Sequence, residues 1–101
     1  MIAIDVAAKE FVRLLDVAIK ITEKMKADSS DALIVGYAGV TIENLNSFRN
    51  MAIAGLLPRP SRREVPLGTG LGLIRGIGEW TDDDDLLDAV YAAESYYKKS
   101  M

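Results

Sequence analysis

Apolar residues recur three and four positions apart over the first quarter of the chain, which is the spacing of one face of an α-helix. Two adjoining rows carry this pattern between residues 4 and 26: Ala7, Phe11, Leu14, Ala18, Ile21 and Met25, and beside them Ala8, Val12, Leu15 and Ile19. Two rows together make an apolar face that is wide enough to pack against two neighbouring helices. The pattern therefore predicts a long helix over residues 4–26.

The next apolar stretch, residues 32–38, is apolar on almost every side, so its pattern fits a buried helix as well as a buried strand. A strand needs partner strands, and the rest of the chain offers few. We therefore predict a helix over residues 30–38. Ser29 or Ser30 is in place to cap its first amides.

Residues 41–55 again show apolar positions at helical spacing. Thr41 is in place to cap the start of this segment, and Gly55 is in place to end it in the left-handed conformation. The sequence thus predicts a helix over residues 41–55. If residues 32–41 are helical as well, the two segments form one long, kinked helix.

All three prolines of the chain lie in residues 57–67, together with Arg59, Arg62 and Arg63. Proline lacks an amide hydrogen and has a fixed φ, so it interrupts regular elements. We expect residues 57–67 to form an exposed, semi-extended connector outside the core.

Five glycines fall between residues 68 and 78, and Gly68, Gly72 and Gly76 recur at every fourth position. A helix over residues 70–79 would have one smooth side, which lets another backbone approach closely. Each interior glycine, however, disfavours a helix by roughly 0.5 to 1 kcal/mol, so a loop followed by a short helix from about Leu71 is the alternative. The spacing does not match the Gly-x-Gly-x-x-Gly pattern of a nucleotide-binding loop, and we favour a packing role for these glycines.

The last predicted helix covers residues 82–98. Thr81 precedes it as a cap, four consecutive aspartates follow at its positive end, and Lys98 and Lys99 lie at its negative end. Four consecutive helical residues point in different directions, so one metal ion could use only two of these carboxylates. Capping and solvation are therefore favoured over a metal site.

These elements together predict an all-α protein, a compact bundle of four to five helices in a single domain. The chain has 101 residues with no Cys and no His, which excludes Ser-His-Asp hydrolysis, Cys-His proteolysis and zinc fingers. We expect no enzymatic activity, no cofactor and no bound metal. No segment has the length and apolarity of a membrane span or a secretory signal, so we expect a cytoplasmic protein without a membrane partner.

The formal net charge is −3, and it is distributed unevenly along the chain. Residues 78–101 carry seven acidic and two basic residues and four of the seven aromatic residues. Acidic and aromatic side chains together are typical of a surface that binds a basic protein. The candidate partner-binding residues are Glu79, Trp80, Asp82, Asp83, Asp84, Asp85, Asp88, Tyr91 and Glu94.

Within this set we expect Tyr91 to be exposed, whereas Trp80 could instead fill the core, as could Tyr97 nearby. Nucleic acid is not an expected partner, because phosphate binding needs a cluster of cations and only Arg59, Arg62 and Arg63 offer one.

The leading functional hypothesis is a small bacterial inhibitor or immunity protein that neutralises a basic, nuclease-type toxin by covering its active-site cleft or an adjacent surface. It rests on composition and charge, by analogy. One alternative is a self-associating structural module or subunit, a homodimer in which the glycine face and the wide face of the first helix bury against a second copy. A second alternative is a small ligand-binding domain or enzyme that uses carboxylate and Tyr side chains.

Overall fold

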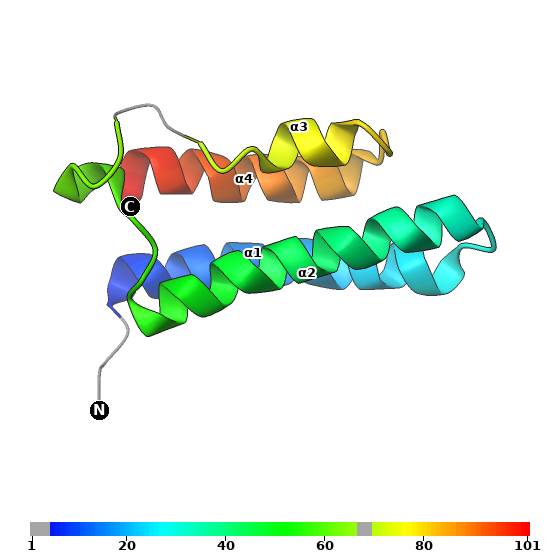
Figure 1. Cartoon of the computed structure of the whole chain (residues 1–101), viewed down its shortest axis with the longest axis horizontal. Coiled ribbons are helices and arrows are strands. Elements are labelled where there is room, and N and C mark those ends of the chain that lie inside the picture. The colour runs from blue at the N-terminus through cyan, green and yellow to red at the C-terminus, as the bar shows by residue number, and fades with distance from the viewer. Residues whose placement is uncertain (1–4, 67–69) are drawn as a thin grey trace.

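Four α-helices and one 3-10 turn make up the parts of the chain that the computed structural model describes, residues 5–66 and 70–101 (Figure 1). The elements follow in the order α1 (Val6–Asp28), α2 (Ala32–Ala54), η1 (Pro60–Arg62), α3 (Leu73–Gly78) and α4 (Asp84–Ser100). The predicted all-α, single-domain bundle is confirmed. None of the helices in the described ranges is both long enough and apolar enough to cross a membrane.

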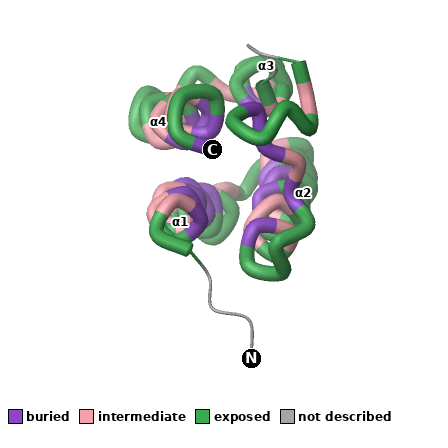
Figure 2. The backbone as a smooth tube through the Cα atoms, turned by 90° about the vertical axis from the view of Figure 1, so that its left-hand side faces the viewer, coloured by how far each residue is buried: buried purple, intermediate pink, exposed green. Residues whose placement is uncertain are grey.

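Helix α1 lies at the centre of the packing, in contact with both α2 and α4. The view along the bundle places the four helices at four corners, with α1 beside α2 and α4 (Figure 2). Phe11, Leu15 and Ala18 of α1 are fully buried between these neighbours. The prediction that α1 uses a wide apolar face against two helices is confirmed, and that face is consequently unavailable to a second copy.

Residues 32–54 form one continuous helix, so the prediction of two separate helices is wrong and the single-helix alternative holds. Thr41 does not cap a helix. Gly39 and Val40 continue the helix without a break, so Thr41 lies inside α2, where its side chain is buried. Gly55 ends α2 with φ of 73°, as predicted.

The cap of α2 is Asp31, whose carboxylate accepts a hydrogen bond from the Leu33 amide at 2.9 Å. The prediction of Ser29 or Ser30 as this cap is wrong. The Ser29 hydroxyl instead accepts from the Asp31 amide at 3.1 Å and stabilises the turn between α1 and α2.

The connector after α2 is more ordered and more buried than predicted. Leu57 is part of the hydrophobic core, and Arg59 is buried with its guanidinium 2.8 Å from the Asp5 carboxylate at the start of α1. The Tyr97 hydroxyl of α4 donates to the Pro58 carbonyl at 2.5 Å. These bonds hold the connector between the first turn of α1 and the last turn of α4.

A short 3-10 turn, η1, lies within the connector, with its proline in the first position, where a missing amide hydrogen costs nothing. The prediction of an exposed segment outside the core is therefore wrong for its first half. Residues 63 and 64 are exposed, as predicted. The last residue of the predicted range, Leu67, lies outside the described residues.

Helix α3 is shorter than the predicted range 70–79, and the alternative of a loop followed by a short helix is confirmed. Gly72 precedes the helix in the left-handed conformation, with φ of 75°. A Cβ atom built on Gly72 or Gly76 would meet nothing within 4 Å, so neither glycine packs closely against another backbone within the chain. The predicted packing role is wrong for both, while Gly68 lies outside the described residues. Gly70 does pack closely, because a Cβ there would lie 2.7 Å from the Glu94 carboxylate and 2.9 Å from the Lys98 side chain.

Helix α4 is capped by Asp83, whose carboxylate accepts from the Leu86 amide at 2.9 Å. The prediction of Thr81 as the cap is wrong by two residues. The Thr81 hydroxyl accepts from the Asp83 amide at 3.2 Å and so orients the actual cap. Lys98 and Lys99 lie in the last turn, as predicted from the helix dipole.

Candidate functional site

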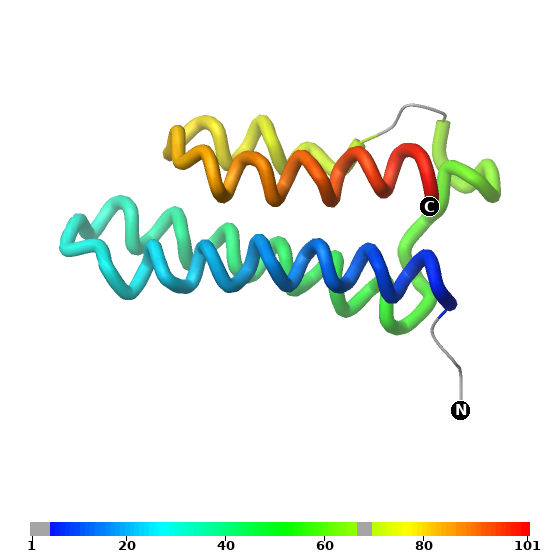
Figure 3. The backbone as a smooth tube through the Cα atoms, turned by 180° about the vertical axis from the view of Figure 1, so that it is seen from behind, coloured from blue at the N-terminus to red at the C-terminus, as the bar shows by residue number. Residues whose placement is uncertain are grey.

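Two acidic segments that are about 50 residues apart in the sequence lie at the same end of the bundle. They are the turn between α1 and α2 and the segment that leads into α4, which share the right-hand end in Figure 1 and the left-hand end in Figure 3. Asp28 from the first segment and Asp83 and Asp85 from the second line one surface hollow. We call this surface the acidic end, and its carboxylates belong to Asp28, Asp31, Glu79, Asp82, Asp83, Asp84 and Asp85.

The charge of the acidic end is not neutralised by ion pairs. Within residues 5–66 and 70–101, none of its seven carboxylates lies within 4.0 Å of a cationic side chain. Lys24 of α1 lines the same hollow as Asp28, Asp83 and Asp85 without reaching ion-pair distance, and both Lys24 and Lys26 are exposed. Like charges on one surface repel one another, so a cationic partner would lower the electrostatic energy of this surface.

The opposite end of the bundle is basic. Arg62 and Arg63 of the connector lie there beside the last turn of α4, which carries Lys98 and Lys99 (Figure 1). We call this surface the basic end. The molecule therefore has opposite charges at the two ends of its long axis.

Asp5 at the basic end is held as a carboxylate. Its pKa is lowered because its oxygen accepts a hydrogen bond from the Ala8 amide, at 2.8 Å, and because the Arg59 guanidinium lies beside it. One acidic residue at this end is thus committed to an ion pair.

The nine predicted partner-binding residues do not share one environment. Six of them are exposed, Trp80 and Asp83 are half-buried, and Glu94 is buried. The exposed members are Glu79, Asp82, Asp84, Asp85, Asp88 and Tyr91. The prediction that Tyr91 points outward is confirmed, since 63% of its surface is accessible.

Glu94 is not a surface residue, which corrects its assignment to a partner-binding surface. It is 5% exposed, and its Oε1 accepts a hydrogen bond from the Leu73 amide at 2.6 Å. The first amides of α3 have no partner within their own helix. Glu94 therefore satisfies the start of α3 from the neighbouring helix, an internal role that the sequence alone did not indicate.

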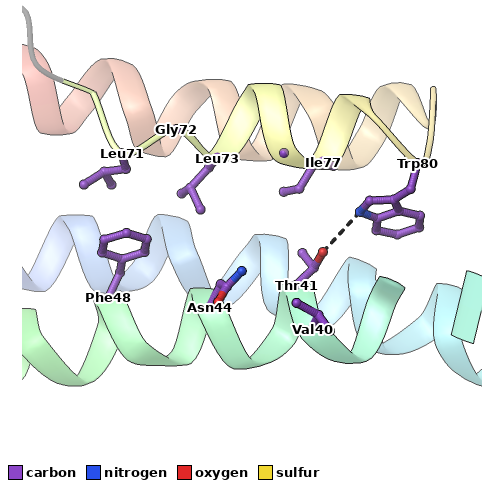
Figure 4. A pocket seen from close by; sticks show the side chains of 10 residues that line it. Val40, Thr41, Asn44, Phe48, Leu71, Gly72, Leu73, Ile77 and Trp80 are labelled. Carbon is purple, nitrogen blue, oxygen red and sulfur yellow. Dashed lines mark hydrogen bonds between the residues drawn. The ribbon is translucent and has the colours of Figure 1, made fainter. Parts of the chain in front are cut away.

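Trp80 lies in the turn between α3 and α4 and contacts the middle of α2. Its indole N–H donates to the Thr41 hydroxyl at 3.2 Å, as drawn in Figure 4. Its ring stacks on that of Tyr37, with centroids 6.3 Å apart and 11° between the ring planes. No local sequence pattern indicates that Tyr37 lies beside Trp80, because the two positions are 43 residues apart.

A groove of about 370 Å³ runs between α2 and α3 (Figure 4). We call it the α2–α3 groove. Apolar side chains dominate its walls, and the smooth Gly72 and Gly76 form part of the α3 side. Its principal lining residues are Val40, Asn44, Phe48, Leu71, Gly76 and Trp80.

An exposed apolar row on α2 continues from this groove towards the acidic end. Leu33, Tyr37 and Val40 are spaced four and three residues apart, so they lie on one side of the helix. Their exposed fractions are 70%, 51% and 57%. Leu33 and Tyr37 belong to residues 32–38, the stretch that is apolar on almost every side. We interpreted that stretch as a buried helix, but the structure leaves both residues exposed.

No group of three carboxylates within the described residues is arranged to hold a metal ion. The residues that line the α2–α3 groove include Thr41 and Asn44 as polar groups and no carboxylate. A ligand site built from carboxylate and Tyr side chains therefore finds no support at this groove.

Comparison of the chain with known protein families, with curated proteins and with solved structures finds no match.

Proposed function

We propose that this protein is a small acidic binding protein whose acidic end docks on a basic partner protein. The closest functional class is an inhibitor or immunity protein that neutralises a nuclease-type toxin in the bacterial cytoplasm. One observation supports the proposal above others: the fold gathers seven carboxylates from two distant segments on one end of the bundle and pairs none of them with a cation at ion-pair distance within the described residues.

The electrostatic reasoning starts from the partner. A protein that cleaves nucleic acid needs cationic side chains around its active site to bind the phosphates of its substrate. A compact cluster of carboxylates offers the same charges as a run of phosphates. The cluster would therefore be attracted over a long range and would compete with the substrate for the same cations.

Aromatic side chains beside the acidic end supply the second part of such an interface. Tyr91 lies three residues after Asp88 on α4, so the two share an exposed side of the helix. On α2, Tyr37 is half exposed and its ring is held in place by Trp80. Rigid aromatic rings often carry most of the binding energy of an interface, while charged residues set the rate and specificity of association.

The test requires the partner itself. Tagged protein, expressed in its native host, is washed at low salt and eluted at high salt, and the co-eluting polypeptide is identified and produced in pure form. A triple variant, Asp82→Asn, Asp84→Asn and Asp85→Asn, removes three charges and leaves the cap Asp83 intact. The matched control removes three exposed charges elsewhere, through Glu23→Gln, Glu43→Gln and Glu64→Gln.

Isothermal titration calorimetry at several salt concentrations then compares the two variants. We expect the triple variant to bind at least about tenfold more weakly at low salt, a loss of about 1.4 kcal/mol, and to depend less on salt than the unchanged protein. The control should bind almost as well as the unchanged protein. Equal affinity of the triple variant and the control, or a partner that is itself acidic, would contradict the proposal.

A further inference from the structure

We propose that two copies of this chain associate through the α2–α3 groove, with their long axes antiparallel. This inference goes beyond the proposed function, because it involves no other protein and is centred on the α2–α3 groove, although Tyr37 belongs to both surfaces. The surface combines the α2–α3 groove with the apolar row of Leu33, Tyr37 and Val40.

The first observation is the unused apolar surface of α2. All three residues of the row are more than half exposed, and they adjoin a groove that is itself mainly apolar. Isolated apolar residues are common on protein surfaces, whereas a continuous apolar patch is typical of an interface. Helix α1 packs on a different side of α2, and α4 lies diagonally across the bundle from α2 (Figure 2), so neither helix covers the exposed row.

The second observation is the shape of the α3 wall. Gly72 and Gly76 present no side chain, and the space above both is open within 4 Å. A glycine surface on one helix lets a second helix approach closely, so that its side chains fill the gap. The protruding row on α2 of a second copy matches such a recess, because the row consists of apolar side chains at helical spacing.

The third observation is the opposite charge of the two ends of the molecule, which favours a second copy in the antiparallel orientation. A two-fold axis perpendicular to the long axis of the molecule sets the same surface of each copy against the other. It also sets the acidic end of each copy beside the basic end of the other. A parallel pair would instead bring two groups of seven carboxylates together.

The dimensions of the molecule are sufficient for this arrangement. The chain is a flat body of 43 × 30 × 17 Å, with α2 running along it over 23 residues, a length of about 34 Å. A stable interface covers about 800 Å² on each partner, roughly an eighth of the accessible surface of 6352 Å². A broad face that contains α2 and α3 can provide this area.

The mass of the protein in solution tests the association directly. Sedimentation equilibrium from about 1 to about 500 µM should show the mass rise from 11.0 kDa to twice this value. The double variant Val40→Gln and Gly76→Gln should weaken the dimer at least tenfold. Val17→Gln replaces a similarly exposed valine on α1 and should leave the dimer unchanged.

Cross-linking tests the orientation, and the absence of cysteine makes it simple. Ser30→Cys labels the acidic end and Lys99→Cys labels the basic end. With a short bismaleimide, a mixture of the two variants should cross-link at least several-fold more than either variant alone. Trp80, the single tryptophan, lies in the groove and should change its emission as the dimer forms.

Three results would overturn the proposal: a mass of 11.0 kDa at every concentration, a dimer that survives the double variant, or cross-linking of each variant to itself in preference to the other. Circular dichroism on each variant separates a loss of association from a loss of folding. Because these measurements use the chain alone, they can fail while binding of a basic partner holds, and the reverse.

Discussion

Helices α1 and α2 have the same length, 23 residues, and pack against each other, yet they use their apolar residues differently. Helix α1 has a charged side and an apolar side, and the ten apolar residues that predicted this helix are all buried or partly buried. Helix α2 is the more apolar of the two, but it buries fewer residues and leaves a row of large apolar side chains exposed.

This difference shows that apolar composition and burial are separate properties of a helix. The sharp pattern of α1 specifies one orientation, because any rotation would bury charges. Helix α2 has no such charged side over its first half, so its orientation is set by its neighbours, and the surplus apolar surface faces outward. Within the monomer Tyr37 of this surface stacks on Trp80, while Leu33 and Val40 remain more than half exposed.

The largest expected effect comes from making the same substitution in both helices. Leu15→Ala in α1 leaves a cavity in the core and should lower the free energy of unfolding by about 2 to 5 kcal/mol, because Leu15 is fully buried. Leu33→Ala in α2 should change it by less than about 0.5 kcal/mol. Urea unfolding at low protein concentration, followed by circular dichroism, measures both. A similar loss of unfolding free energy in the two variants would show that the Leu33 side chain is buried in solution as Leu15 is.

The next largest loss of stability is expected when the N-terminal cap of either helix is removed. Asp5 caps α1 and also pairs with the buried Arg59, whereas Asp31 caps α2 alone. Asp31→Ala should cost about 1 kcal/mol, and Asp5→Ala about 2 kcal/mol, because it also leaves Arg59 without its partner. The same urea titration at neutral pH compares them, and an equal cost would show that the ion pair adds nothing.

The pH dependence of Asp5 sharpens this test. Its pKa in the folded protein is lowered below the ordinary 3.8, so its stabilisation is fully present above that value and is lost as the pH falls through the folded pKa. The difference between the unchanged protein and Asp5→Ala should therefore shrink on acidification below about pH 4. A difference that stays constant down to about pH 2 would contradict the lowered pKa.

The smallest effect compares two buried threonines. The Thr22 hydroxyl of α1 donates to the Ala18 carbonyl of its own helix at 2.8 Å, whereas Thr41 of α2 accepts from Trp80 on another element. Thr22→Val should change stability by less than about 0.5 kcal/mol, while Thr41→Val leaves the indole N–H without its acceptor and should cost about 1 kcal/mol. Urea unfolding followed by Trp80 emission measures both changes, and an equal cost would contradict a stabilising bond between α2 and the turn after α3.

Much of the fold was predictable because it depends on interactions between near neighbours in the sequence. The periodicity of residues 4–26 predicts α1 and its two-sided packing, and Gly55 predicts the end of α2. The predicted caps were wrong by one or two residues at α2 and at α4, because several consecutive Ser, Thr and Asp residues can each accept the same amide bonds. The choice among them depends on the path of the incoming chain.

The candidate site was predictable only in part. The exposed aspartates before and within α4 follow from their charge, as does the exposure of Tyr91. Glu94 has the same charge but lies inside, because it meets the Leu73 amide 21 residues earlier in the chain. A sequence pattern indicates that a residue is acidic, but it does not indicate which buried amide lies opposite to it.

By itself the sequence determined that the chain is helical, that α1 is the most strongly amphipathic of its helices, and that negative charge is concentrated near the C-terminus. Only the tertiary structure decided which acidic segments share one end, which glutamate is buried, and that α2 and α3 face each other across a groove. The reason is physical: helix periodicity and capping act within a few residues, whereas these three features depend on contacts between segments about 20 to 50 residues apart.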